Sequence, residues 1–159
     1  MPRLEHKIDH FDLKILDCLQ RDGSLSNQEV AERVGLSQSP CSRRIRALEN
    51  SGVIAGRRVI LDAKKLGLNL EVVLMVKLDR DIPERFERFE STIAKIPQVL
   101  QCLMITGQDA TYLLKIIVHD MEEYQDVLLN HITRIEGVDG VHSSFVLRTI
   151  LDSNAIPLS

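Results

Sequence analysis

A turn of only three residues, 35–37, separates two segments with helical patterns, and this spacing constrains the fold more than any other feature. Before the turn, Ser26 and Glu29 stand at the spacing of a capping box, and Gly35 ends the helix. After the turn, Pro40 lies in the first turn of a helix, where an N–H has no intrahelical partner to lose. A connection this short forces the two helices to cross steeply, so the sequence predicts a helix-turn-helix.

The second of these helices has one packing face and one face rich in hydrogen-bond donors. Ser37 is expected to cap it through its hydroxyl, and Gly52 to end it. Cys41, Ile45 and Leu48 recur at spacings of four and three, which places them on one apolar stripe. The donor face carries Ser39, Ser42, Arg43 and Arg46. Because Cys41 lies on the packing stripe, it is interpreted as a core thiol rather than a redox switch.

The charge of the chain is distributed unevenly, which bears on the choice of partner. The net charge of −3 taken alone argues against nucleic acid, but Arg33–Arg58 contains six Arg against one Glu. Residues 1–58 carry 10 Lys and Arg against 8 Asp and Glu, whereas residues 59–159 carry 10 against 15. A basic front part and an acidic back part suggest separate functions, and the front part suits double-stranded DNA.

The basic segment offers two kinds of DNA contact. The start of a recognition helix enters the major groove, so Ser39, Ser42 and Arg43 are predicted to contact base edges. Contacts to phosphates are predicted for Arg44, Arg46, Arg57 and Arg58. The last two lie in "VIAGRRVILD", a β-prone piece expected to form a wing beside the helix-turn-helix. The alternative is a solvated helix face, and the capped turn, the wing and the local positive charge argue against it.

Beyond residue 69 the pattern repeats the order strand, helix and strand. Strands are predicted at 69–79, 99–106, 111–118 and 141–151, and helices at 83–96 and 121–135. Two such halves give the order βαββαβ, a ferredoxin-like layer of four strands with two helices on one face. Val73 and Met75 would point to the other face, where a second subunit is the expected cover, because a large exposed apolar face is costly.

The predicted architecture is an α+β chain of two domains. A winged helix-turn-helix occupies residues 1–61, a linker 62–69 and the βαββαβ domain 70–159. Three distant cysteines, no signal-like start and no apolar run of about 18–20 residues indicate a soluble protein of the reducing cytoplasm that does not span a membrane. The five histidines are scattered, and no Gly-x-Ser-x-Gly, phosphate loop or paired-Cys spacing occurs. No metal, no cofactor and no enzymatic activity are therefore predicted.

The chain resembles the Lrp/AsnC (feast/famine) family of bacterial and archaeal transcriptional regulators over nearly its full length. The resemblance rests on the Asp9 and Asp12 pair that opens the first helix, on "SNQEVAERVGLSQSPCSRRIRALENSGVI", on "YLLKIIVHDMEEY" and on "SSFVLRTI". Its most specific part is "VGLSQSPCSRRIRALE". The resemblance implies DNA binding by the first domain, and amino-acid sensing and dimerisation by a second domain of RAM type. It also implies that homodimers assemble into larger rings, with a tetramer of dimers expected.

The loop "TGQDATYLL" is the second place where chemistry is expected. Backbone N–H groups around Gly107 can turn toward a carboxylate, and Asp109 can hold an ammonium group, which suits a free amino acid. An ordinary β-turn is the alternative. In family members this loop resembles the pattern Gly, two variable residues and then Asp-Tyr. In this chain Tyr112 lies five positions after Gly107 rather than four, and Thr111 stands in the Asp place. The predicted effector residues are Gly107, Gln108, Asp109, Thr111, Tyr112, Met121 and Phe145. Tyr112, Met121 and Phe145 match family positions associated with effector response, although each also fits a core position.

The effector is predicted to bind at an interface between dimers, because an exposed loop needs partners on several sides to bury a zwitterion. An apolar wall from the neighbouring subunit would favour leucine or methionine. The chain is accordingly predicted to be a sequence-specific DNA-binding transcriptional regulator. The alternative is a regulatory amino-acid-binding subunit of an enzyme of amino-acid metabolism, since βαββαβ domains also serve that purpose. The helix-turn-helix favours the regulator, because an enzyme subunit has no need of it.

Overall fold

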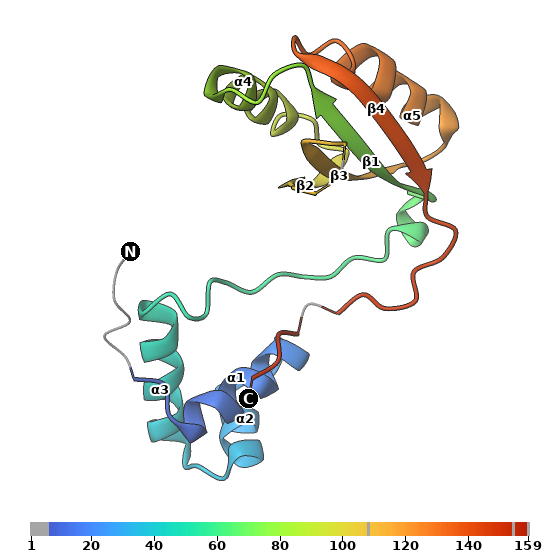
Figure 1. Ribbon diagram of the computed structural model, residues 1–159. Coiled ribbons are helices and arrows are strands. Elements are labelled where there is room, and N and C mark those ends of the chain that lie inside the picture. The colour runs from blue at the N-terminus through green and yellow to red at the C-terminus, as the bar shows by residue number, and fades with distance from the viewer. Residues whose placement is uncertain (1–6, 108, 154, 159) are drawn as a thin grey trace. The chain divides into compact units, whose positions relative to one another are not determined.

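The computed structural model describes residues 7–107, 109–153 and 155–158, which divide into two compact units. The first unit runs up to Ile60 and takes in the end of the chain from Leu151, and the second unit is Leu61–Ile150. The chain therefore passes from one unit to the other twice (Figure 1). The expected second domain, 70–159, needs a correction at its end, because Gln20 of the first unit hydrogen-bonds Ile156.

Three helices build the first unit, and they are the predicted helix-turn-helix with one helix before it. Their bounds are α1 (His10–Arg21), α2 (Asn27–Val34) and α3 (Gln38–Asn50). A capping box of Asp9 and Asp12 begins α1. The predicted capping box begins α2, where Ser26 N donates to the Glu29 carboxylate at 2.7 Å. Gly35 ends α2 with φ 74°, a left-handed conformation that glycine adopts without steric cost. The prediction of a helix-turn-helix is confirmed.

The start of α3 differs from the prediction in one detail. Ser37 is the N-cap residue, but its hydroxyl makes no capping hydrogen bond. The first helical bond instead runs from Cys41 N to Ser37 O at 3.2 Å. Beyond the helix, Gly52 adopts φ 77°, so the predicted stop is confirmed.

The core of the first unit contains the predicted stripe of α3. Its buried side chains come from all three helices and the turn before α2: Ile15, Leu25, Val30, Ala31, Val34, Cys41, Ile45 and Leu48. Burial raises the pKa of the Cys41 thiol, which keeps the sulfur protonated at neutral pH. Cys41 is therefore a core residue, as the spacing predicts.

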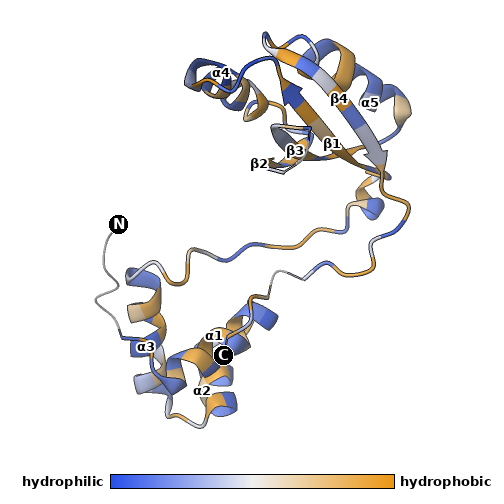
Figure 2. Cartoon of the chain, in the orientation of Figure 1, coloured by the Kyte–Doolittle hydropathy of each residue, from blue (hydrophilic) through white to orange (hydrophobic). Residues whose placement is uncertain are grey.

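The expected wing is not a β-structure in this chain. No strand occurs within residues 53–62, and the donation from Ile54 N to Leu48 O, at 3.1 Å, is the last described backbone hydrogen bond that ties this segment to α3. Val59 and Ile60 are both 83% exposed, in an extended run that Figure 2 colours as apolar. β-prone residues form a ladder only where a partner strand is at hand, and within these residues the chain supplies none.

The second unit has the predicted βαββαβ order. Its elements are a short 3₁₀ turn η1 (Lys64–Leu66), β1 (Leu70–Leu78), α4 (Pro83–Ile93), β2 (Val99–Met104), β3 (Tyr112–Val118), α5 (Met121–Asp126), its π-helical continuation η2 (Val127–Ile132), and β4 (Val138–Phe145). The four strands form one antiparallel sheet in the order β2-β3-β1-β4. The last strand was expected at 141–151. It lies earlier because its ladder with β1 begins at the Leu78–Val138 pair and ends at Val72–Phe145.

The two faces of the sheet differ as the alternation predicts. Val72, Leu74 and Val76 are fully buried in a core with side chains of α4 and α5. Val73 and Met75 alternate with them and stay half-buried on the opposite face, which these helices leave uncovered. In the described residues, no helix is long and apolar enough to cross a membrane.

Candidate functional site

One side of α3 presents a row of hydrogen-bond donors away from the core. Ser39, Arg43 and Arg46 are exposed and Ser42 is half-buried, and their spacings of three and four place them on one side of the helix. Asn27 of α2 donates to Ser42 Oγ at 3.3 Å. Neither Arg43 nor Arg46 forms an ion pair with any residue that the structure describes, so both guanidinium groups can meet an anion from outside.

Arg44 points elsewhere, which differs from the expected phosphate contact. Its Nη1 donates to Asp12 at 2.9 Å and meets Asp9 at 2.8 Å, and its guanidinium carbon lies 5.7 Å from the centroid of the Phe11 ring. The backbone N–H of Asp12 and the Arg44 guanidinium both lower the pKa of the Asp9 carboxyl. Arg44 is therefore part of the packing between α3 and α1, because Asp12 is buried and a buried carboxylate needs a cation.

Arg57 and Arg58 lie in the extended segment that follows α3. Arg57 Nη2 is 3.4 Å from Glu49 Oε1 at the end of α3, and both side chains are more than two-fifths exposed. Arg58 is exposed and forms no ion pair within the described residues. The two charges thus remain available to an outside anion, although the segment that carries them is not the predicted wing.

The loop between β2 and β3 contains the next group of predicted residues. Gly107 adopts φ 89°, which favours glycine and lets the chain turn there. Asp109 is 86% exposed, and its Oδ1 accepts a hydrogen bond of 2.5 Å from Lys77 Nζ. Thr111 is tied to β1 twice: its N donates to Val76 O at 2.8 Å and its Oγ1 accepts from Leu78 N at 3.1 Å. Thr111 thus anchors the loop, while Gln108 lies outside the described residues.

Tyr112 points into the core of the second unit. It is 1% exposed, stacks on Phe89 with ring centroids 4.5 Å apart, and donates its hydroxyl to Glu90 Oε1 at 2.8 Å. Burial, together with the Glu90 carboxylate, raises the pKa of the Tyr112 phenol. Of the two alternatives that the sequence left open for Tyr112, this chain places the side chain in the core.

Met121 and Phe145 lie at the other end of the sheet. Met121 begins α5 after the end of β3, and Phe145 pairs with Val72 near the start of β1. They are 45% and 42% exposed, and the Phe145 ring meets Tyr124 edge to face at 5.6 Å. Tyr112 is at the opposite end of β3, which at about 3.3 Å per residue separates the two groups by roughly 20 Å. The structure therefore does not bring the predicted effector residues into one site of a single chain.

Lys77 is a candidate binding residue that the sequence reasoning missed. It projects from the open face of β1 and, with Asp109 and His142, lines a hollow of about 340 Å³. The hydrogen bond with Asp109 raises the pKa of Lys77, so the amine stays protonated beside the carboxylate. Its signal in the sequence was the charge that interrupts an otherwise apolar alternation, "VVLMVKL".

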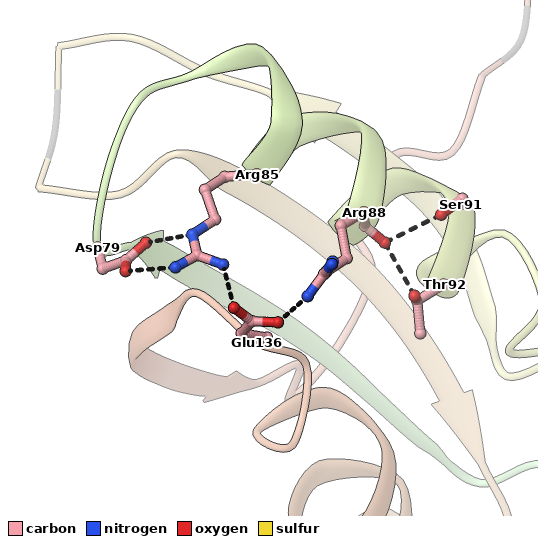
Figure 3. Close-up of polar contacts among 6 residues, drawn as sticks. All are labelled: Asp79, Arg85, Arg88, Ser91, Thr92 and Glu136. Carbon is pink, nitrogen blue, oxygen red and sulfur yellow. Dashed lines mark hydrogen bonds and ion pairs between the residues drawn. The ribbon is translucent and has the colours of Figure 1, made fainter.

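A charged cluster lies just beyond the same end of β1 (Figure 3). Arg85 of α4 donates to both oxygens of Asp79, at 3.1 and 3.2 Å, and to Glu136 at 2.8 Å. Arg88 also pairs with Glu136. Asp79 N donates to Gly137 O at 2.8 Å. The cluster joins β1, α4 and the turn before β4, so its role in this chain is structural.

Comparison with known proteins shows to which family the chain belongs. The family model described as Lrp/AsnC ligand binding domain matches residues 71–156, and the one described as winged helix-turn-helix DNA-binding matches residues 8–55. The chain belongs to the Lrp/AsnC family. It is 40% identical to the Bkd operon transcriptional regulator of Pseudomonas aeruginosa over 152 residues, which are 96% of this chain and 99% of that relative.

Two further matches extend the comparison. The leucine-responsive regulatory protein of Klebsiella pneumoniae is 37% identical over 149 residues, 94% of this chain and 90% of the relative. The crystal structure of a transcriptional regulator of Neisseria meningitidis in complex with L-Met superposes with a TM-score of 0.91 at 36% identity, covering 96% of this chain and 97% of that one. This Lrp/AsnC protein is a DNA-binding transcriptional regulator with an amino-acid-binding second domain.

Proposed function

We propose that this Lrp/AsnC regulator reads its operator with the first turns of α3. Ser39, Ser42 and Arg43 would contact base edges in the major groove. Arg46, Arg57 and Arg58 would contact phosphates, whereas Arg44 is left out because it binds Asp12. The observation that carries the proposal is the exposed guanidinium of Arg43, which no described carboxylate neutralises, at the start of a helix that a three-residue turn fixes.

We also propose that the regulator acts as a homodimer joined through the open sheet face. The half-buried Val73 and Met75 support this, because pairing two such faces removes apolar surface from water. Two recognition helices would then meet half-sites about one helical turn, or a multiple of it, apart. Dimers would assemble further, with a tetramer of dimers favoured, because the effector loop and the Met121–Phe145 group need different subunits to meet.

The effector we propose is leucine or methionine, bound at an interface between dimers. The backbone around Gly107 would take the α-carboxylate and Asp109 the α-ammonium. Lys77 already places an ammonium group against Asp109, which supports this role for the carboxylate. The names of two similar proteins, one leucine-responsive and one in complex with L-Met, support the choice of side chain.

We propose further that the chain has no enzymatic activity and needs no cofactor, and that it works in the cytoplasm, where its DNA partner lies. The similar proteins are transcriptional regulators, which supports this. The alternative is a role as a regulatory subunit of an enzyme of amino-acid metabolism. It leaves the row of hydrogen-bond donors on α3 without a function.

The experiment that tests the proposal measures binding to the DNA upstream of the protein's own gene. Fluorescence anisotropy with that duplex and with a random duplex, each with and without a panel of amino acids, gives specificity and effector response together. We expect tighter binding to the upstream duplex and a response to leucine or methionine. Equal affinity for both duplexes would contradict the role of α3, and a response only to charged amino acids would contradict the effector.

A further inference from the structure

The side chain of Gln20 on α1 forms two hydrogen bonds with the last described residues of the chain. Gln20 Nε2 donates to Ile156 O at 3.1 Å, and Ile156 N donates to Gln20 Oε1 at 3.0 Å. One primary amide thus satisfies both backbone groups of a single residue, as a neighbouring β-strand would. This pairing fixes the position of the tail, which we define as residues 155–158.

The tail forms one wall of an apolar groove in the first unit. A cavity of about 400 Å³ is lined by Ile156 and Leu158 from the tail, Leu16 and Leu19 from α1, and Val53 and Ile54 from the segment after α3. Leu158 is half-buried, whereas Ile156 remains 66% exposed. The amide of Gln20, rather than burial of Ile156, therefore holds the tail in place.

The opposite wall of this groove continues into the predicted phosphate contacts. Ala55, Gly56 and Arg57 line the same cavity. Within the described residues, no backbone hydrogen bond holds residues 55–58 after Ile54, and the Glu49 carboxylate is the only group that hydrogen-bonds the Arg57 side chain. The course of the chain through Arg57 and Arg58 therefore depends on what packs in the groove beside it.

We propose that the tail is a strap that completes the DNA-binding unit by ordering residues 53–58. The inference rests on the proposed phosphate contacts of Arg57 and Arg58. Because the strap continues from β4, it is also a second covalent route, besides residues 59–69, by which the effector domain connects to the DNA-binding unit. A change at the end of β4 would then reach Arg57 through the strap and alter DNA affinity.

The test compares three variants of the full protein. Gln20→Ala removes both hydrogen bonds, a chain that ends at Asp152 removes the strap but leaves α1 intact, and the third variant combines the two. We expect each single change to weaken binding to the upstream duplex about threefold to tenfold, from the net strength of one or two hydrogen bonds. Hydrogen exchange at the backbone N–H of Ile54, which donates to Leu48 O, should become faster in both variants.

The combined variant gives the decisive result. Both single changes remove the same contact, so the combined variant should bind DNA no more weakly than the truncation alone. Leu147→Ala, which changes a side chain that is 97% exposed in the chain before the strap, serves as the control and should bind DNA as the wild type does. Additive losses of DNA affinity, or unchanged hydrogen exchange at Ile54, would overturn the strap.

Two measurements separate this inference from the proposed function. Arg57→Ala tests the phosphate contact itself: if it leaves DNA affinity unchanged, the proposed function is wrong at that residue. If Arg57→Ala weakens DNA binding but the strap variants do not, the strap alone is wrong. Calorimetry with leucine and methionine should show that every strap variant still binds the amino acid, because the effector loop lies in the other unit.

Discussion

Arg44 of α3 donates to Asp12 of α1 at 2.9 Å, and the Asp12 side chain has no exposed surface at all. The recognition helix is thus tied to the helix before the helix-turn-helix by a charge pair at the edge of the core. This pair fixes which side of α3 faces α1, and so which side exposes Arg43 and Arg46 to solvent. In the proposed function, Arg44 therefore sets the orientation of the DNA contacts without being one of them.

Arg44→Leu should strongly destabilise the first unit. The variant keeps an apolar stem but removes the Arg44 guanidinium from the buried Asp12 carboxylate, a change that costs about 3 kcal/mol in comparable pairs. Urea unfolding followed by circular dichroism measures the free energy of unfolding. Arg46→Ala is the matched control, since an exposed arginine of the same helix should change stability by no more than about 0.5 kcal/mol. Equal stability of the two variants would contradict the structural role of Arg44.

Arg43→Ala and Arg57→Ala should impair DNA binding in different ways. Loss of a base contact should cost about 1–3 kcal/mol at one base position and relax the sequence preference there. Loss of a phosphate contact should weaken all sequences alike and lower the salt slope of log K by about one. Binding to specific and random duplexes at several salt concentrations measures both effects. The assignment fails if the two variants lose the same affinity on both duplexes.

The helix-turn-helix could be predicted from the sequence because its signals are local. Ser26, Glu29 and Gly35 act within one turn of the helix that they begin or end, and nothing distant overrides them. The βαββαβ order was equally accessible, because the polar Glu71 and Lys77 alternate with a continuous apolar row that includes Val72 and so indicate which face of the strand is buried.

The features that were missed depend on contacts distant in sequence. Spacing places Arg44 beside the packing stripe of α3 but does not reveal that Asp12 of another helix is buried against it. The strand propensity of Val59 and Ile60 indicates a wing but does not supply a partner strand. Nothing in the local pattern around Ile156 indicates that Gln20 would hold its backbone. Matched family positions likewise do not reveal that Met121 lies at the far end of β3.

Gly137→Ala should destabilise the second unit. Gly137 has φ 100°, and a Cβ there would lie 2.7 Å from Arg85 Cδ, so both the backbone and the pairing of Arg85 with Asp79 must shift. Together these effects should cost about 1–3 kcal/mol in the free energy of unfolding. Gly140→Ala is the control, because its Cβ would make an ordinary contact of 3.8 Å with Lys77. Thermal unfolding measures the loss of stability in both variants. A larger loss of stability for Gly140→Ala than for Gly137→Ala would contradict the close contact between residue 137 and Arg85.

Glu123→Gln should make the free energy of unfolding less dependent on pH in the acid range. The backbone N–H of His119, the Gln98 amide and the His119 side chain lower the pKa of Glu123 from 4.5 to about 2. A lowered carboxyl pKa contributes stability that is complete above about 4.5 and is lost as the pH falls toward 2. Urea midpoints across this range should therefore fall less steeply for the variant than for the wild type. Glu122→Gln, a change at the exposed neighbouring residue, is the control. The slope of its urea midpoint against pH should equal that of the wild type.

Asp109 and Lys77 make the sharpest test of the effector loop. If Asp109 holds the α-ammonium of the amino acid, then Lys77 competes with the ligand for the same carboxylate. Asp109→Ala should weaken leucine or methionine binding by at least about tenfold, the usual effect of losing a charged hydrogen bond. Lys77→Met should strengthen binding, by no more than about fivefold, because exposed ion pairs are weak.

Calorimetry gives both affinities, and light scattering on the same samples follows the assembly of dimers. Asp139→Ala removes one exposed carboxylate near Lys77 without touching the loop, so it controls for net charge and should bind the effector as the wild type does. Opposite effects of the Asp109 and Lys77 changes are what competition requires, because one removes the acceptor and the other frees it. If both variants weaken binding equally, the pair acts as a structural unit and the ammonium of the ligand binds elsewhere.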